Sequence, residues 1–194
     1  MTAKPLIHEV LPPFPTRAAL ALEGTTHREL ERVFLRGSTP DLDQLVGWEF
    51  RGVNHPDWAW PLGIKKFVKG FYRDGDQVFG YNRAVRTNVL DGRWNMSWPD
   101  DDPHRYGYFL VAPVDAASPD NAALHSVLLD YARGGNKPWD PQRGLRDYLV
   151  QVDDANPHLF LGKAYYRLGP LPAVHSNFFI LERHQPGLSD YARR

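Results

Sequence analysis

The two-residue periodicity that begins after Gly47 is the feature that most constrains the fold of this chain. Eight later segments are rich in Val, Tyr, Phe and Leu, and turn-forming residues separate them. One such turn, Asp74-Gly75, lies between two of these segments and predicts a tight hairpin. The predicted strands are 48–54, 64–73, 77–89, 105–113, 125–132, 145–153, 158–168 and 175–183. The pattern therefore indicates a mainly antiparallel β fold.

Neither face of these strands is consistently polar. In the last predicted strand, for example, Phe178 and Ile180 oppose Phe179 and Leu181. Both faces must then be buried, and we expect a lumen on one side and the N-terminal helices on the other. Eight strands that close on themselves enclose roughly enough room for side chains or one small ligand. We predict a single antiparallel β-barrel of about eight to ten strands, with a two-sheet sandwich as the alternative.

Glycines inside the predicted strands also favour a barrel. In a strand, glycine usually marks a bulge, a sharp bend or the close approach of another group. Bent strands suit a barrel better than a flat sheet. These glycines are at positions 70, 80, 107 and 162.

The chain of 194 residues is expected to form one domain over 1–194. Four prolines in residues 1–15 predict an extended arm, and residues 16–46 are expected to hold short helices. Thr26 and Glu29 have the spacing of a capping box, and that helix should end at Gly37. A second helix is expected over 40–46 with Thr39 as its cap. Residues 47–184 would form the barrel, and residues 185–194 a tail.

Composition and charge exclude several classes of protein. Lys plus Arg and Asp plus Glu are both 23, so the formal net charge is zero, whereas nucleic-acid binders normally carry a basic excess. There is no cysteine to form disulfides or cysteine-based metal sites. No apolar run at the N-terminus is long enough for a signal peptide or a membrane span. We expect a cytoplasmic protein with neither a nucleic-acid partner nor a membrane span.

The junction at Gly47 and Trp48 resembles the entry to calycin barrels, in which a short helix runs into the first strand. Calycins include the lipocalins, the fatty-acid-binding proteins and the nitrobindin-like proteins. In these families the tryptophan closes the narrow end of the barrel, and an arginine from a late strand often lies across its ring. The matching residue here is Arg183. The resemblance implies a cation–π contact of about 0.5–2 kcal/mol, and it leaves the ligand open.

The eight histidines form no His-x-His or HExxH pattern. Nitrobindin-like barrels use a histidine to bind iron, and the resemblance makes His158 and His175 the candidates for that role. Ordinary structural or surface roles explain the histidines as well. We therefore predict no metal site and no cofactor.

An arginine that points into the barrel must be paired, because an isolated buried charge is very costly. Arg83 and Arg86 lie on opposite faces of one predicted strand, so one of them should point inward. A ligand carboxylate would pair with it in the manner of fatty-acid-binding barrels. The alternative partner is a protein acid such as Asp130, Asp147 or Glu182. We take Arg86 as the candidate for the ligand's head group.

The loop 55–62 contains two tryptophans and is expected to cover the mouth of the barrel. The alternative is a loop that its tryptophans simply hold against the barrel wall. We predict that these two tryptophans bind the ligand together with Arg86 and aromatic side chains of the strands. The predicted ligand-binding residues are Arg86, Trp58, Trp60, Tyr81, Tyr166 and Phe178.

The predicted function is the binding of a small hydrophobic molecule with a polar or anionic head inside the barrel. One alternative is a cofactor-independent enzyme of cyclase or isomerase type, in which a tyrosine and a carboxylate transfer protons. Such an enzyme should have a titratable group with a shifted pKa facing a cavity. Another alternative is a protein-interaction module with a filled barrel and an exposed apolar patch. The sequence does not decide whether the protein is an enzyme.

Overall fold

The structure is a computed structural model that describes residues 11–86, 88–99, 103–117, 123–167, 169 and 173–188, with Trp58 described by its backbone alone. The first ten residues of the predicted arm and residues 189–194 of the predicted tail lie outside the described residues. So do the predicted strand positions 87 and 168.

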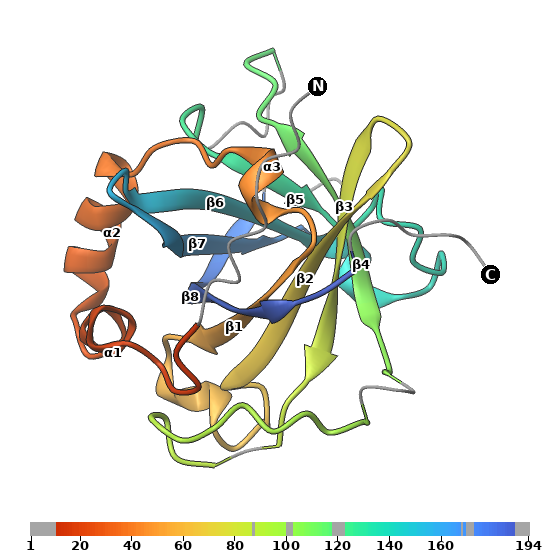
Figure 1. Cartoon of the computed structure of the whole chain (residues 1–194). Coiled ribbons are helices and arrows are strands. Elements are labelled where there is room, and N and C mark those ends of the chain that lie inside the picture. Colours follow the sequence, from red (N-terminus) through yellow and green to blue (C-terminus); the bar gives the residue numbers. More distant parts are fainter. Residues whose placement is uncertain are drawn as a thin grey trace, which may run out of the picture.

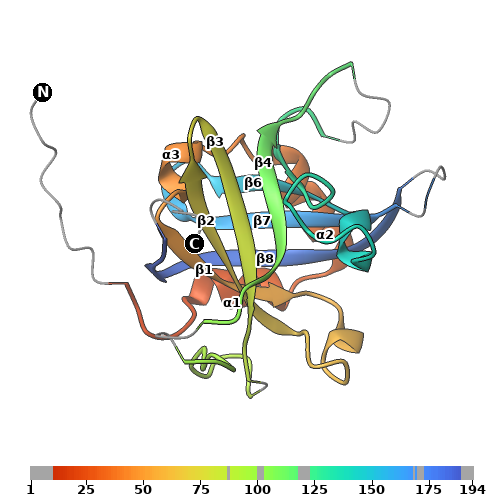
Figure 2. The ribbon, with the colours of Figure 1, turned by 90° about the vertical axis from the view of Figure 1, so that its right-hand side faces the viewer.

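The described strands form a closed antiparallel barrel in which each strand pairs with its neighbour in sequence and the last pairs with the first (Figure 1). Figure 2 shows one wall, β2 to β4, in front of the opposite wall, β6 to β8. The strands are β1 (Trp48–Asn54), β2 (Lys66–Asp74), β3 (Gln77–Ala84), β4 (Tyr106–Pro113), β5 (Val127–Asp130), β6 (Leu145–Asp153), β7 (Asn156–Tyr166) and β8 (Val174–Pro186). The predicted barrel is confirmed, with eight strands, and the sandwich alternative is excluded by the closure.

Each predicted strand overlaps an observed one, and the largest difference is at the end of β3. The sequence predicts a strand over 77–89, but β3 ends at Ala84. At Val85 the chain leaves the ladder and forms an isolated bridge with Met96. The segment that follows packs on the outside of the barrel, so its apolar residues do not extend the strand.

In the described part of the chain, three α-helices precede the barrel, and two 3₁₀ turns interrupt its loops. The Thr26 side chain accepts from the Glu29 amide and Gly37 caps the other end of α2, which confirms the predicted cap and end of that helix. The next helix, α3, is capped by Asp41 rather than by Thr39, because the Asp41 carboxylate accepts from the Asp43 amide at 3.0 Å. The helices are α1 (Arg17–Glu23), α2 (His27–Arg36) and α3 (Leu42–Leu45), and the 3₁₀ turns are η1 (Asp57–Ala59) and η2 (Pro141–Gly144).

Aromatic side chains fill one half of the lumen. Phe50 meets Phe71 and Phe160 edge to face, each at 5.4 Å between ring centroids. Phe71 meets Phe109 in the same way at 5.6 Å. All four rings are fully buried, and edge-to-face pairs add to the free energy of burying the rings. This half of the barrel is solid core.

Trp48 and Arg183 close the barrel at this filled end. The guanidinium carbon of Arg183 lies 4.8 Å from the centroid of the Trp48 ring. Arg183 also donates from Nη2 to the Gln44 carbonyl at 2.7 Å and so ties β8 to α3. The predicted contact between Trp48 and Arg183 is confirmed.

The outer face of the barrel is buried in two places. α1 and α2 cover the wall formed by β6, β7 and β8 (Figure 1), where Leu30 and Phe34 of α2 pack against Phe178 and Ile180. On the other side the segment after β3 covers β1 and β2 with Trp94. The two apolar faces seen in the sequence are thus both buried, as predicted.

Glycines allow rings to lie flat against the barrel wall. A Cβ built on Gly162 would lie 2.0 Å from the Phe179 ring, and one on Gly80 would lie 2.2 Å from Phe109. Gly107 has φ +53° beside the irregular pairing of β3 with β4. The predicted close approaches at Gly80 and Gly162 are confirmed.

Lys66 holds the covering segment on the outer face. Its ammonium lies 3.7 Å from the centroid of the Trp94 ring and contacts Asn88 Oδ1. It also donates to the carbonyls of Val89 and Arg93, each at 3.2 Å. Burial lowers the pKa of Lys66 to about 8, although the charge of nearby Asp91 opposes this shift.

Replacing Arg183 with Met should lower the free energy of unfolding by about 1–3 kcal/mol, because the cation–π contact and a charged hydrogen bond are both lost. Urea denaturation measures the change. The matched control is Arg73→Met. Arg73 pairs with Asp43 at the surface, so that change should cost less than about 1 kcal/mol. Equal losses for the two variants would contradict a special role for Arg183.

Stability should depend on pH through Lys66. Between pH 8 and its unfolded value of 10.5, the unfolded chain holds a proton on Lys66 that the folded chain has lost. The free energy of unfolding therefore rises with pH across this window. Urea titrations of wild type and Lys66→Met from pH 7 to 9.5 isolate this contribution, since all other groups are shared. The wild type should gain stability relative to the variant as the pH rises. A constant or shrinking difference would show that the pKa of Lys66 is not lowered.

Candidate functional site

A cavity of about 320 Å³ occupies the half of the barrel that the aromatic rings leave open. On β2 its lining residues Phe67 and Lys69 precede the core residue Phe71, and on β6 Leu145 and Asp147 lie at the same end of the barrel. Its other apolar walls include Ile64, Ala84, Ala164 and Phe179. Ile64 and Ser176 are exposed, so the cavity reaches the surface at their end.

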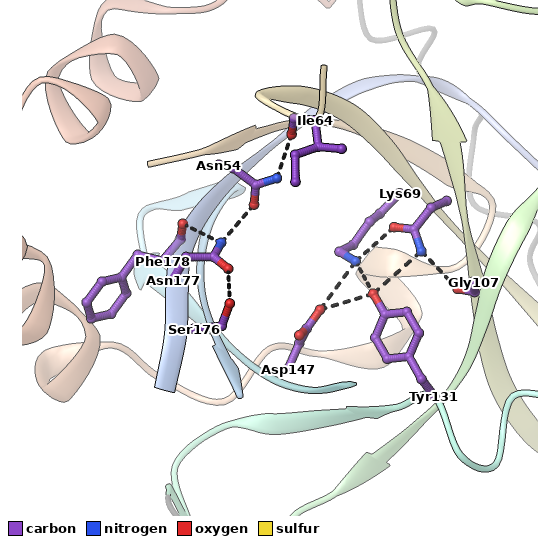
Figure 3. A network of polar contacts seen from close by, with 10 residues as sticks. Asn54, Ile64, Lys69, Gly107, Tyr131, Asp147, Ser176, Asn177 and Phe178 are labelled. Carbon is purple, nitrogen blue, oxygen red and sulfur yellow. Dashed lines mark hydrogen bonds and ion pairs between the residues drawn. The ribbon is translucent and has the colours of Figure 1, made fainter. Parts of the chain in front are cut away.

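Four polar side chains form the floor of this cavity. Lys69 Nζ donates to Asn82 Oδ1 at 2.9 Å, contacts the Tyr131 hydroxyl, and pairs with Asp147 Oδ2 at 3.4 Å. The Tyr131 hydroxyl donates to the same Asp147 oxygen at 3.1 Å. Figure 3 shows Lys69, Tyr131 and Asp147 converging from three sides. We call these four residues the polar floor.

The strand register explains why these residues meet. Lys69 and Asn82 are direct partners across β2 and β3. Asp147 is on β6, opposite Leu129 of β5, and Tyr131 follows that strand on the same inward face. All four side chains are buried, with at most 6% of the residue surface exposed. The polar floor thus lies directly on the aromatic half of the core.

Burial shifts the pKa values of three residues of the polar floor. It lowers the pKa of Lys69 and raises the pKa of Asp147, and the attraction between the two charges opposes both shifts. Burial also raises the pKa of the Tyr131 phenol well above its usual value, and the Asp147 charge adds to this. Tyr131 therefore remains a protonated donor.

Aromatic rings partly replace the water that Lys69 loses. Its ammonium lies 5.0 Å from the centroid of Phe109 and between 5.2 and 5.3 Å from those of Phe67, Tyr131 and Phe179. Ring faces attract cations, and more strongly where water is excluded. These contacts and the ion pair make a buried ammonium tolerable.

The opposite wall of the cavity carries a second polar group near the mouth (Figure 3). Asn177 donates to Asn54 Oδ1 at 2.8 Å and accepts from the Ser176 hydroxyl at 2.9 Å. Asn54 in turn donates to the Ile64 carbonyl at 2.6 Å. This chain joins β8, β1 and the segment before β2, so it fixes the rim of the cavity.

The structure places three of the predicted ligand-binding residues away from the cavity. Arg86 is exposed beyond the end of β3 and lies with Trp94 at a separate surface depression. Tyr81 is on the outer face of β3, where its hydroxyl donates to Glu49 at 2.8 Å. Phe178 is on the outer face of β8 beneath α2. On β3 the side chain of Asn82 points into the lumen, so the side chain of the adjacent Tyr81 points outward.

The other three predicted residues lie nearer the open end. Tyr166 pairs with Leu145 in the ladder and donates to the Pro141 carbonyl at 2.7 Å. Trp60 is half-buried beside Lys65, whose ammonium lies 5.7 Å from its ring. Trp58 is in η1, and its side chain lies outside the described residues. The loop leads into Gly63 and Ile64, which line the cavity.

The predicted inward arginine is replaced by a lysine. Arg83 points outward and pairs with Glu49 at 2.9 Å. Lys69 occupies the lumen instead, and its partner is Asp147, one of the acids considered from the sequence. The available signal was the position of Lys69 between Phe67 and Phe71 on one face of a strand.

Several of the described histidines make structural contacts. His55 meets the Thr25 carbonyl at 2.9 Å, and His125 meets the Phe34 carbonyl at 3.0 Å. His175 packs among the rings of His27, Tyr165 and Phe178. Within the described ranges, no three His, Asp or Glu side chains gather in a way that could hold a metal ion.

No protein-family model, curated protein sequence or solved structure matches this chain. Of the helices that the structure describes, none has the length and apolar character to span a membrane.

Replacing Asp147 with Leu should lower the free energy of unfolding by about 3–5 kcal/mol, because it leaves the buried Lys69 charge uncompensated. Adding Lys69→Met should restore most of that loss, since the charge is then absent as well. Urea denaturation of the two single variants and the double variant measures this coupling. If the two single losses simply add in the double variant, the ion pair has no energetic role.

Proposed function

We propose that the protein binds a small, mainly apolar molecule with a polar head in the open half of the barrel. The observation that carries this proposal is a cavity with apolar walls above a buried floor of Lys69, Asn82, Tyr131 and Asp147. Ligand sites typically combine apolar walls with a few convergent polar groups. The apolar body would contact the walls, and the head would meet the polar floor.

The size of the cavity limits the ligand. Its volume of about 320 Å³ is near the lower end of the range of roughly 300–1,000 Å³ for ligand pockets. The aromatic half of the lumen cannot be entered without displacing fully buried rings such as Phe71 and Phe160. The proposed ligand is accordingly compact, about the size of one or two fused rings.

We also propose that the barrel is calycin-like. The support is the order of the strands, the contact of Arg183 with Trp48 at the closed end, and the cavity at the opposite end. A short helix, α3, leads into the first strand beside that contact. Fold likeness leaves the ligand open, so the binding proposal rests on the cavity alone.

A second candidate function is proton transfer on a molecule bound in the same cavity. It is favoured by the raised pKa of Asp147, whose carboxylate lines the cavity with the protonated phenol of Tyr131 beside it. Groups with shifted pKa values in a cavity are typical of acid–base sites. The filled-barrel interaction module is less well supported, because the lumen holds a cavity.

Filling the cavity tests the binding proposal. Ala164 is buried and lines the cavity, so the ring in Ala164→Phe should occupy the space intended for a ligand. Calorimetric titration with 2-naphthol should show one saturable site in the wild type and at least about a tenfold weaker one in the variant. Cavity filling normally leaves a protein folded or more stable, which circular dichroism checks.

The control variant is Ala155→Phe, which adds the same ring at an exposed turn between β6 and β7. It should bind 2-naphthol as the wild type does. If Ala164→Phe also binds 2-naphthol with wild-type affinity, the probe does not enter the cavity and the proposal fails. Native mass spectrometry of gently purified wild type and Ala164→Phe adds a second readout, because a retained small molecule should be lost from the variant.

A further inference from the structure

One oxygen of the polar floor has no hydrogen-bond partner. Asp147 Oδ2 contacts both Lys69 and Tyr131, whereas Oδ1 has no partner among the residues that the structure describes. The Asp147 side chain is buried, lines the cavity and lies between its two walls (Figure 3). Buried acceptors of this kind are rarely left unpaired, and an unpaired charged one is especially costly.

The polar floor has no free donor to offer this oxygen. The three protons of Lys69 face Asn82 Oδ1, the Tyr131 hydroxyl and Asp147 Oδ2. The Tyr131 proton is donated to Asp147 Oδ2. The Asn82 amide donates to the Gly107 carbonyl at 2.8 Å and reaches the Tyr131 hydroxyl at 3.5 Å. Any donor for Oδ1 must therefore come from outside the polar floor.

The polar side chains of the opposite wall also have hydrogen-bond partners. The Asn177 amide donates to Asn54 Oδ1 and to the Phe178 carbonyl, and its own oxygen accepts from Ser176. The Asn54 amide donates to the Ile64 carbonyl. Among the described polar side chains in these two groups, Asp147 Oδ1 is thus the buried acceptor that has no hydrogen-bond partner.

From this arrangement we infer that the ligand carries a neutral hydrogen-bond donor, of which a hydroxyl group is the simplest, and donates it to Asp147 Oδ1. The inference rests on the proposed function and narrows the polar or anionic head expected from the sequence. A ligand carboxylate would meet a second carboxylate and find no unused proton on Lys69. A ligand ammonium would lose its hydration next to the positive charge of Lys69. The loss of hydration and the repulsion between like charges are both unfavourable.

Three probes of nearly the same shape test this head-group choice. 2-Naphthol has a hydroxyl donor, 2-methoxynaphthalene has the oxygen without the donor, and 2-naphthoate has an anionic head. Isothermal titration calorimetry of the wild type at pH 7 compares their dissociation constants. The naphthol should bind at least about tenfold more tightly than either of the others, the effect of one hydrogen bond to a charged acceptor.

The variant that keeps the cavity but removes the charges is Lys69→Met with Asp147→Leu. Its floor keeps the neutral Asn82 and Tyr131 but lacks the charged Asp147 acceptor, so it should bind the naphthol and the methoxy compound within about threefold of each other, since no hydrogen bond to a charged group remains. If this double variant still binds the naphthol about tenfold more tightly than the methoxy compound, a group other than Asp147 recognises the hydroxyl and the inference is wrong. The ranking of probes on the wild type does not depend on whether the double variant folds.

The outcomes separate this inference from the proposed function. If the wild type binds the methoxy compound or the naphthoate as tightly as the naphthol, and Ala164→Phe abolishes that binding, the cavity is a ligand site and the donor inference is wrong. If Ala164→Phe weakens no probe, or if no probe binds the wild type, the proposed function fails and the inference fails with it. Preference for the naphthol that Ala164→Phe abolishes supports both.

Discussion

The pairing of β1 with β8 is the interaction on which the rest of the structure depends. It runs along the whole of β1, from Trp48 to Asn54, and converts a meander into a closed ring without exposed edges. Side chains reinforce this seam on the outside, where Arg51 of β1 bonds to Glu182 of β8 at 2.8 Å. Glu182 also accepts from the Thr16 amide at 3.2 Å, which attaches the start of α1 to the seam. Closure therefore also determines where the first helix docks.

Once the ring is closed, its interior divides into two parts with different chemistry. Edge-to-face rings around Phe50 and Phe71 make one half a dry core. The other half holds a cavity above an ion pair that the aromatic half shields from water on one side. An ion pair in this position adds little stability over apolar packing of similar volume. We therefore propose a role toward a ligand for this buried pair, which lines the cavity.

The alternation of residues after Gly47 was enough to predict the strands and the closed barrel, because two apolar faces require two buried surfaces. The calycin resemblance added the contact between Trp48 and Arg183. Most of the residues that line the cavity were not predicted, for a related reason. With both faces apolar, the sequence does not reveal which face points inward, so Tyr81 and Phe178 were assigned to the lumen although they lie outside. The assignment of Arg86 depended on a strand that ends at Ala84.

Lys69 illustrates what sequence reasoning lacked. Its partners come from β3, β6 and the residue after β5, and only the register of the closed barrel brings them together. The sequence includes Asp147 among the acids that would pair with an inward cation, but it predicts that cation as an arginine on β3 instead of Lys69 on β2. The sequence makes no prediction for Trp94 and Met96 of the covering segment, because the residues that they pack against, Val53 and Val68, lie on β1 and β2.

The central claim is that the open half of the barrel admits a small molecule and the filled half does not. Methyl NMR during a titration with 2-naphthol tests this most directly. The methyl groups of Ala84 and Ala164, which line the cavity, should shift progressively and saturate. Those of Val111 in the filled half and Ile180 beneath the helices should hardly move. Shifts confined to Ile180 or to surface residues, with Ala84 and Ala164 unchanged, would contradict the account.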